Sequence, residues 1–290
     1  MTDQRALFLV NRHARQGQQQ AETAAEQLRA LGLTLLEKET GDPNHLSDTI
    51  RHHQDEVDLV IIGGGDGTLN GAIAALVETQ LPLGILPLGT ANDLARTLAI
   101  PTSLPEACQI IADGKTQRID LGQVNDQYFF NVASLGLSVQ ITRSLTKDVK
   151  RRWGILAYAV TALKVLWRSR PFRAEIRLGE HSEKVKTVQI AVGNGRFYGG
   201  GMTVAADAAI DDRRLDLYSL DMEHWWQVIA LLPALRRGQH ASASWVHSWQ
   251  GKEFHVYTRR PRSINTDGEI TTSTPAHFRV VPKALSVLVP

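Results

Sequence analysis

The sequence predicts an α/β N-terminal domain with a doubly wound parallel sheet, followed by a larger C-terminal domain that is mainly an antiparallel β-sandwich. Two observations carry this prediction. Over residues 1–122, short apolar runs alternate with segments whose apolar residues recur at helical spacing, which is typical of a parallel sheet with helices between its strands. After Gly122, strand-like runs separated by turns dominate, which favours a sandwich over residues 123–290.

In the first domain, apolar runs predict strands at 6–10, 33–36, 59–62 and 83–86. Apolar residues at helical spacing predict helices at 21–31, 45–53, 69–77, 94–98 and 105–112. Ligands of such sheets bind beyond the carboxyl ends of the strands. The loops that leave this edge are therefore expected to converge there, and they are 11–15, 40–42, 63–68 and 87–93.

The second domain is expected to open with a β-hairpin whose turn lies at 125–127. Further strands are predicted at 172–178, 185–192, 215–220, 254–258, 278–281 and 285–289. Two helical stretches, 153–167 and 224–235, interrupt this series. Their tryptophans and cationic ends suit either a helix that covers a sheet or one that lies at a membrane surface.

Composition limits the function. The chain has 290 residues, of which 43% are hydrophobic and 21% charged, and a net charge of +2. Two domains with sizeable cores are therefore expected, and no overall positive field favours nucleic acid as a partner. Because Cys108 is the only cysteine, disulfides within the chain and cysteine-based zinc sites are excluded.

Nothing in the sequence predicts export or membrane insertion. The first residues lead directly into a short strand and do not resemble a signal peptide. No apolar run reaches the roughly 18 residues that a membrane-spanning helix needs. We therefore expect a cytoplasmic protein, with peripheral contact at the inner face of the membrane as an open alternative.

The loop Gly-Gly-Gly-Asp-Gly-Thr at 63–68 follows a buried strand and precedes a helix. Such a loop leaves backbone N–H groups unpaired at a helix N-terminus, where the helix dipole favours an anion such as phosphate. The loop fits neither the P-loop, which needs a lysine, nor the Gly-x-Gly-x-x-Gly fingerprint. Asp66 would repel phosphate unless a cation, a donor or a backbone cap lies beside it. The alternative is a tight turn in which Asp66 or Thr68 caps the helix.

An acidic turn in the second domain is a candidate cation site. Its carboxylates repel one another unless they are spread apart or bridged by a cation such as Mg²⁺ or Ca²⁺. The alternative is a solvated turn neutralised by Arg213 and Arg214. The carboxylates belong to Asp207, Asp211, Asp212 and Asp216.

Asp267 and Glu269 flank Gly268. In a strand their carboxylates would point to the same face, and two close carboxylates suit a division of roles in which one is a general base. The alternative is an ordinary Asp-Gly turn. The glycine-rich stretch 194–201 is either a flexible loop or a backbone that lies against a ligand. The 10 histidines show no metal-ligand spacing.

Together these motifs resemble the diacylglycerol-kinase-like lipid kinases, in the bacterial branch of that family. The resemblance covers essentially the whole chain. The motif at 64–68 alone is shared with NAD kinases and, more remotely, with phosphofructokinases, whereas Pro-Leu-Gly-Thr-Ala-Asn-Asp at 87–93 is far more specific to the lipid kinases. The other matching motifs are 193–201, the turn near Asp212, and 267–269.

The resemblance implies a nucleotide site in the cleft between a catalytic domain at 1–122 and a second domain at 123–290 that carries the catalytic carboxylates and the lipid site. The implied ATP-binding residues are Asn11, Arg15, Thr40, Gly64, Gly65, Asp66, Gly67, Thr68, Leu69, Asn70, Thr90, Asn92 and Asp93. A metal ion, Mg²⁺ or alternatively Ca²⁺, is implied at Asp212 and at the backbone carbonyls near Ala209 and Arg214, with Asp216 as an optional further ligand. The family usually has Asp-Gly where this chain has Asp212-Arg213.

The implied reaction transfers the γ-phosphate of ATP to a lipid hydroxyl, with Asp267 or Glu269 as the general base. The sequence chooses neither between these carboxylates nor among lipids such as diacylglycerol, phosphatidylglycerol or a sphingoid base. Two rivals stay open, an NAD kinase of the same fold and a non-catalytic nucleotide- or lipid-binding protein. The implied partner is a lipid substrate, and a peripheral membrane surface and a homodimer are further alternatives.

Overall fold

The computed structural model describes residues 4–10, 15–39, 43–144, 170–195, 197–198, 202–203, 209–221 and 245–290. The chain forms two compact units. The first contains Met1–Leu121, Gly199–Gly201 and Pro282–Pro290, and the second contains Gly122–Tyr198 and Met202–Val281. The division of labour that the sequence predicts between residues 1–122 and 123–290 stays a prediction, as does the nucleotide cleft.

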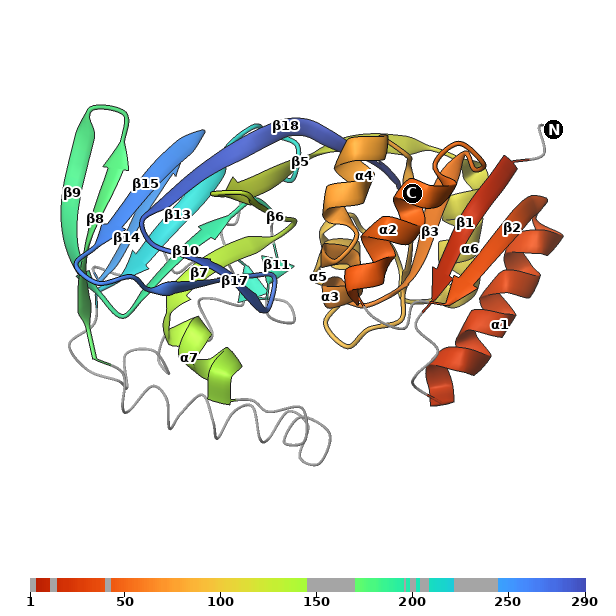
Figure 1. The fold of residues 1–290 in the computed structure, drawn as a ribbon, viewed down its shortest axis with the longest axis horizontal. Helices are drawn as coiled ribbons and strands as arrows, with labels where there is room; N and C mark the ends of the chain where they lie inside the picture. The colour runs from red at the N-terminus through yellow and green to blue at the C-terminus, as the bar shows by residue number, and fades with distance from the viewer. Residues whose placement is uncertain are drawn as a thin grey trace. The chain divides into compact units, whose positions relative to one another are not determined.

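The first unit is built on a parallel sheet with the strand order β2-β1-β3-β4 (Figure 1). All residues of the central strand β3 are buried, which is why its sequence is apolar without alternation. The predicted doubly wound parallel sheet is thus confirmed. Its strands are β1 (Gln4–Val10), β2 (Leu33–Glu39), β3 (Leu59–Gly64) and β4 (Leu83–Pro87).

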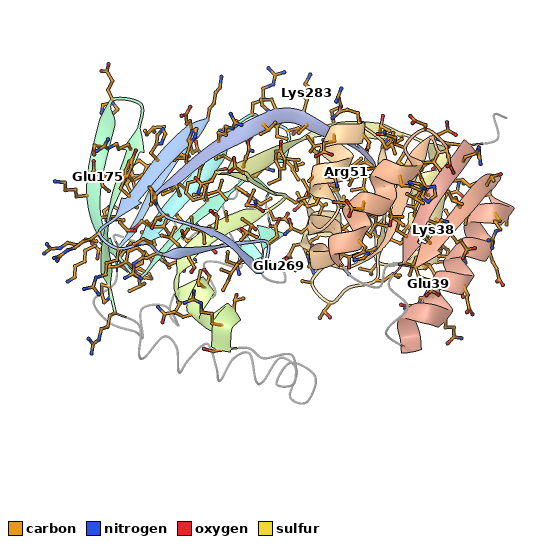
Figure 2. The ribbon with its side chains drawn as sticks, viewed as in Figure 1. Lys38, Glu39, Arg51, Glu175, Glu269 and Lys283 are labelled. Carbon is orange, nitrogen blue, oxygen red and sulfur yellow. The ribbon has the colours of Figure 1, made fainter. Side chains whose placement is uncertain are left out.

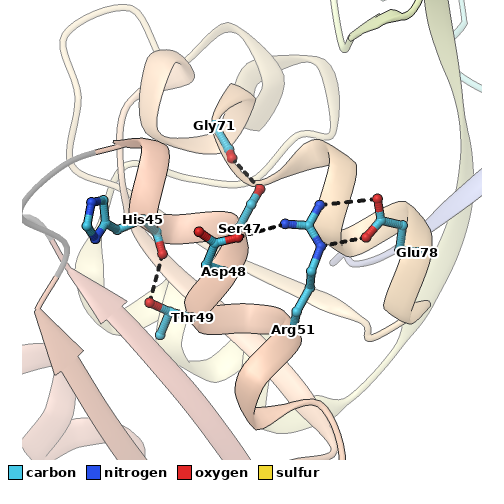
Figure 3. Close-up of polar contacts among 7 residues, drawn as sticks. All are labelled: His45, Ser47, Asp48, Thr49, Arg51, Gly71 and Glu78. Atoms are coloured by element: carbon cyan, nitrogen blue, oxygen red, sulfur yellow. Dashed lines mark hydrogen bonds and ion pairs between the residues drawn. The ribbon is translucent and has the colours of Figure 1, made fainter.

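Helices connect these strands as the sequence predicts, with two differences. The helix expected at 21–31 begins at Arg15, which was expected to lie in a loop. The single helix expected at 69–77 is two short helices that meet at Gly71 and Ala72. The hydroxyl of Ser47 donates to the Gly71 carbonyl at 2.8 Å, so this carbonyl is bound by a side chain at the break (Figure 3). The helices are α1 (Arg15–Ala30), α2 (Pro43–His53), α3 (Asp66–Asn70), α4 (Ile73–Thr79), α5 (Asp93–Thr97) and α6 (Leu104–Asp113).

An ion pair links α2 to α4. The guanidinium of Arg51 donates to both carboxylate oxygens of Glu78, at 2.6 and 3.1 Å, and to Asp48 at 3.1 Å (Figure 3). The hydrogen bond to Glu78 raises the pKa of Arg51, and the same bond lowers the pKa of the Glu78 carboxyl. Because these side chains are exposed, the pair is expected to contribute little to the stability of the fold.

The second unit contains two antiparallel sheets. One has the order β14-β13-β10-β7-β16-β17. Its strands are β7 (Val132–Gly136), β10 (Gln189–Gly193), β13 (Leu215–Leu220), β14 (Val246–Gly251), β16 (Ser263–Thr266) and β17 (Glu269–Ser273). The other sheet pairs β9, β8, β15 and β18 in that order, and β5 and β6 join it at β18. Its strands are β5 (Thr116–Val124), β6 (Gln127–Phe129), β8 (Phe172–Leu178), β9 (His181–Thr187), β15 (Glu253–Thr258) and β18 (Ala276–Leu288).

Alternate residues of both sheets form one hydrophobic core. Phe254 and Val256 of β15 and Ala276 and Phe278 of β18 point inward, and they meet residues such as Leu215 from the facing sheet. Residues between these positions point outward, as the period of a strand requires. The predicted antiparallel sandwich is therefore confirmed. Smaller elements of this unit are α7 (Leu137–Ser144), β11 (Phe197–Tyr198) and β12 (Met202–Thr203).

One strand prediction in this part of the second unit is wrong in detail. The strand expected at 185–192 is divided between β9 and β10, because the chain changes sheets at Val188. There the N–H of Val188 donates to the Leu220 carbonyl at 3.0 Å, and the Thr187 hydroxyl donates to the Gln189 carbonyl at 2.8 Å.

The helices expected at 153–167 and 224–235 lie outside the described residues. None of the helices within the described ranges has the length and apolar character that a membrane crossing needs.

Strands β5 and β18 each contribute residues to both units. The strands expected at 278–281 and 285–289 are parts of the single strand β18. Beyond residue 281, β18 runs parallel to β4, with Val287 beside Leu83, and the N–H of Lys283 donates to the Asp120 carboxylate at 2.7 Å. These pairings place residues 282–290 in the first unit, whereas the sequence analysis placed them in the second.

Candidate functional site

In the first unit, the loops that follow β3 and β4 cross at two glycines. A Cβ atom on Gly89 would lie 2.4 Å from the Cα of Gly65, and one on Gly65 would lie 3.1 Å from the Cα of Gly89. The first distance is far below any van der Waals contact, and both partners are backbone atoms that no rotamer change can move. The glycines therefore permit a close backbone crossing that any side chain at position 89 would block.

Asp66 connects the same two loops. Its Oδ1 accepts a hydrogen bond from the N–H of Leu94, in the first turn of α5, at 3.2 Å. The Leu94 amide is thus a donor beside the Asp66 carboxylate, one of the groups expected to offset its repulsion of phosphate. The N-cap of α3 is Gly65, and neither Asp66 nor Thr68 makes a side-chain cap to that helix.

Asn92 shapes the loop between β4 and α5. Its side chain accepts from the N–H of Gly89 at 3.0 Å and donates to the carbonyls of Gly89 and Pro87 at 2.9 and 3.2 Å. The residue is buried and has a φ of 50°, a left-handed conformation that asparagine tolerates better than most residues. We therefore interpret Asn92 as a residue that builds the loop.

The structure brings most of the expected nucleotide-binding residues to one edge of the parallel sheet. In the order β2-β1-β3-β4, the chain adds β2 on one side of β1 and then adds β3 and β4 on the other side. Ligands of such sheets bind at the switch point between β1 and β3. Leu69 and Asp93 are buried, whereas Gly67 and Thr90 are exposed. Asn11 and Thr40 lie outside the described residues, and Arg15 begins α1 with its side chain outside the described set.

The glycine crossing gives a stability prediction. We expect Gly89→Ala to lower the free energy of unfolding by about 1–3 kcal/mol, because the added methyl group overpacks two backbones. Gly65→Ala is the comparison variant. Its Cβ would lie 3.1 Å from the Cα of Gly89, so its free energy of unfolding should fall by less than that of Gly89→Ala. Urea unfolding of both variants measures the difference. Equal stability of Gly89→Ala and the unmodified chain would contradict the crossing.

In the acidic turn of the second unit, N–H groups of the turn itself contact the Asp212 carboxylate. The Asp212 carboxylate accepts from the N–H of Arg214 at 3.1 Å and from the N–H of Ala209 at 3.4 Å, and the Arg214 Nε lies 2.9 Å from Oδ2. Arg213 has a φ of 61°, the conformation for which glycine is favoured, which explains why the family usually has Asp-Gly here. Asp207 lies outside the described residues.

The donor set of this turn does not fit a resident cation. Both oxygens of Asp212 are engaged by N–H groups, and a guanidinium already supplies the positive charge. Asp216 is buried in β13, where its Oδ1 accepts from Gln250 at 2.7 Å across the strand pair. In this arrangement the carboxylates of Asp212 and Asp216 are committed to protein contacts, so no chemical step is derived through a metal ion at this turn.

Asp267 and Gly268 form the turn between β16 and β17, with φ values of 46° and 100°. Of the two alternatives, the structure therefore shows the Asp-Gly turn and not a strand with both carboxylates on one face, since only Glu269 belongs to a strand. The Asp267 carboxylate accepts three backbone hydrogen bonds, from the N–H groups of Phe130 at 2.7 Å and of Asn131 and Val132 at 3.0 Å each. These contacts anchor the turn to the segment before β7.

Glu269 is exposed, and its side chain makes no hydrogen bond or ion pair within the described ranges (Figure 2). The start of the glycine-rich stretch packs on the segment that binds Asp267. The N–H groups of Asn194 and Gly195 donate to the Asn131 carbonyl at 2.8 and 3.2 Å, and the Asn194 side chain donates to Phe130 at 2.8 Å. Residues 130–132 thus organise the site, and the sequence analysis missed them because they act through backbone groups.

Two family models match the chain. The diacylglycerol kinase catalytic domain matches residues 5–124, and the YegS C-terminal NAD kinase beta sandwich-like domain matches residues 131–289. Among curated relatives, a protein of Mycobacterium tuberculosis named diacylglycerol kinase is 34% identical over 244 residues, which cover 80% of this chain and 77% of that protein. A protein of Enterobacter sp. named probable lipid kinase YegS-like is 34% identical over 243 residues, which cover 81% and 79% of the two chains.

The fold agrees with solved structures. A crystal structure of a diacylglycerol kinase from Bacillus anthracis superimposes with a TM-score of 0.82 at 21% identity and covers 99% of this chain and 97% of that one. The architecture and the matched models define the class as two-unit kinases with a YegS-type sandwich. This chain belongs to the diacylglycerol-kinase-like family of lipid kinases.

Proposed function

We propose that the protein is an ATP-dependent lipid kinase that transfers the γ-phosphate of ATP to the hydroxyl of a lipid such as diacylglycerol. The observation that carries the proposal is the turn 267–269, in which one carboxylate is fixed by three backbone amides and the neighbouring one is left exposed. Membership of the lipid kinase family supports the substrate class.

The two carboxylates have different roles in this proposal. Glu269 is the general base, because it is exposed and its side chain has no partner among the described residues. It accepts the proton as the lipid oxygen forms its bond to the γ-phosphorus and the bond to the leaving ADP oxygen breaks. Asp267 is a positioning residue, since its oxygens are bound by the amides of residues 130–132.

The nucleotide phosphates are proposed to bind at residues 64–70. The N–H groups of Asp66 and Gly67 lie at the start of α3, where a helix offers no intrahelical acceptor, so they are suited to phosphate oxygens. Thr90 is exposed on the neighbouring loop. Asn11, Arg15 and Thr40 are proposed contacts by family resemblance. The divalent cation enters with ATP as part of the substrate.

The test is an assay with γ-labelled ATP and the full-length protein. Diacylglycerol in mixed micelles, a total lipid extract and NAD⁺ are offered as separate acceptors. We expect label in the organic phase, on a phosphorylated lipid that mass spectrometry identifies. Label on NAD⁺ alone would support the NAD kinase alternative. ATP binding with no labelled acceptor would support a non-catalytic binding protein.

A further inference from the structure

We propose that Glu253, His255 and His277 form a binding site for a divalent transition-metal ion such as Zn²⁺, on the outer face of the sandwich. This site is independent of the proposed kinase site. One ligand atom from each residue, a carboxylate oxygen or an imidazole nitrogen, lies within 4.8 Å of the other two. No other group of histidine, cysteine, aspartate and glutamate side chains in the described ranges meets that spacing.

Strand geometry creates the cluster. Phe254 and Val256 point into the core, so Glu253 and His255 lie together on the opposite face of β15. The antiparallel register places His277 of β18 directly opposite His255. Two ligands at alternate positions of one strand and a third on the neighbouring strand present three donors from a rigid scaffold.

The distances suit a tetrahedral ion. Glu253 Oε1 lies 3.1 Å from His255 Nε2 and 2.7 Å from His277 Nε2. Zinc bonds of about 2.0–2.2 Å at tetrahedral angles separate the ligand atoms by roughly 3.3 Å. The imidazole rings are stacked with centroids 4.4 Å apart and an interplanar angle of 7°, so both rings must rotate out of the stack to direct their nitrogens at one ion. Both side chains are 39% exposed, which leaves room for this rotation.

Glu253 supplies the carboxylate of the cluster, and its Oε1 faces one nitrogen of each imidazole. The two guanidiniums opposite the cluster have other partners. Arg177, opposite His255, pairs with Glu175 at 2.7 Å, and Arg279, opposite Glu253, donates to Gln123 at 2.8 Å.

The ligand set selects the metal. Imidazole nitrogens suit Zn²⁺, Co²⁺, Ni²⁺ and Cu²⁺, whereas Mg²⁺ and Ca²⁺ prefer oxygen ligands. The Mg²⁺ that accompanies ATP is therefore not expected to occupy this site. With three protein ligands, a fourth position stays open to water. A bound ion would join β15 to β18 and stabilise the folded state by an amount that rises with the logarithm of the free ion concentration above its Kd.

The test uses the full-length protein after treatment with a chelator. Calorimetric titration with Zn²⁺ is expected to show one site that Mg²⁺ does not fill, and Co²⁺ is expected to give the visible absorption bands of a tetrahedral complex. Glu253→Gln, His255→Gln and His277→Gln should each weaken Zn²⁺ binding at least tenfold. Circular dichroism checks that these exposed substitutions leave the fold intact.

The matched control is the double variant His52→Gln, His53→Gln. It removes another adjacent histidine pair, whose His53 lies 3.2 Å from Glu56. Zinc affinity should stay within twofold of the unmodified chain in this control. Absence of stoichiometric Zn²⁺ binding, or equal Zn²⁺ affinity in the three ligand variants and the control, would overturn the proposal.

Discussion

Glu269→Gln is expected to reduce lipid phosphorylation at least a hundredfold while the protein folds normally. A positioned general base contributes about 10²–10⁴-fold to such a reaction, and the amide of glutamine cannot accept the hydroxyl proton. Because the Glu269 side chain is exposed and makes no described contact, the free energy of unfolding should change by less than about 0.5 kcal/mol. The turnover number with the lipid found in the acceptor assay and a urea unfolding curve measure the two effects.

Glu183→Gln is the control for this substitution. Glu183 is an exposed glutamate of β9 in the same unit, so the variant makes the same chemical change away from the turn. Its lipid phosphorylation should match that of the unmodified chain. If Glu269→Gln keeps more than a tenth of the turnover, Glu269 is not the general base.

Asp267→Ala is expected to lower both stability and activity. Three buried backbone N–H groups at residues 130–132 would lose a charged acceptor, and each hydrogen bond to a charged group contributes about 1.5–3 kcal/mol. Since water can replace part of these bonds, we expect the free energy of unfolding to fall by about 3–5 kcal/mol. Urea unfolding measures this loss. Asp267→Asn, which keeps one acceptor oxygen, should lie between the alanine variant and the unmodified chain.

Asp126→Ala separates this effect from the general cost of changing a turn residue. Asp126 is an exposed aspartate in the turn between β5 and β6. Its replacement should change the free energy of unfolding by less than about 0.5 kcal/mol. The anchoring role of Asp267 is disproved if the two alanine variants are equally stable.

The strands of the first unit were predictable because local sequence determines them. The run 59–62 is apolar at every position, and such a run is typical of a central strand of a parallel sheet that is buried on both faces. The break at Gly71 was not predictable, since the Ser47 hydroxyl that binds its carbonyl comes from another helix. The division at Val188 has the same origin, because its partners lie at Leu137 and Leu220.

The sequence predicted those parts of the candidate site that are formed by the side chains of recognisable motifs. Motifs revealed Asp66 and the pair Asp267 and Glu269. The partners of Asp66 and Asp267, however, are the backbone amides of Leu94 and of residues 130–132, which any sequence supplies. The histidine cluster was missed because its members meet through the register of β15 and β18. The spacing of these residues along the chain does not predict the register between the two strands.

The passage of β18 through both units has a consequence for how the protein is made. Residues 282–290 leave the ribosome long after β4, yet β4 finds its parallel neighbour among them, with Val287 beside Leu83 and the Ala284 carbonyl bound by Gln80 at 3.1 Å. Until then the nascent parallel sheet has an unpaired edge at β4, which is a template for aberrant strand pairing. The first unit therefore completes its fold after the second has been synthesised, and a fragment cut at residue 122 would keep that edge permanently open.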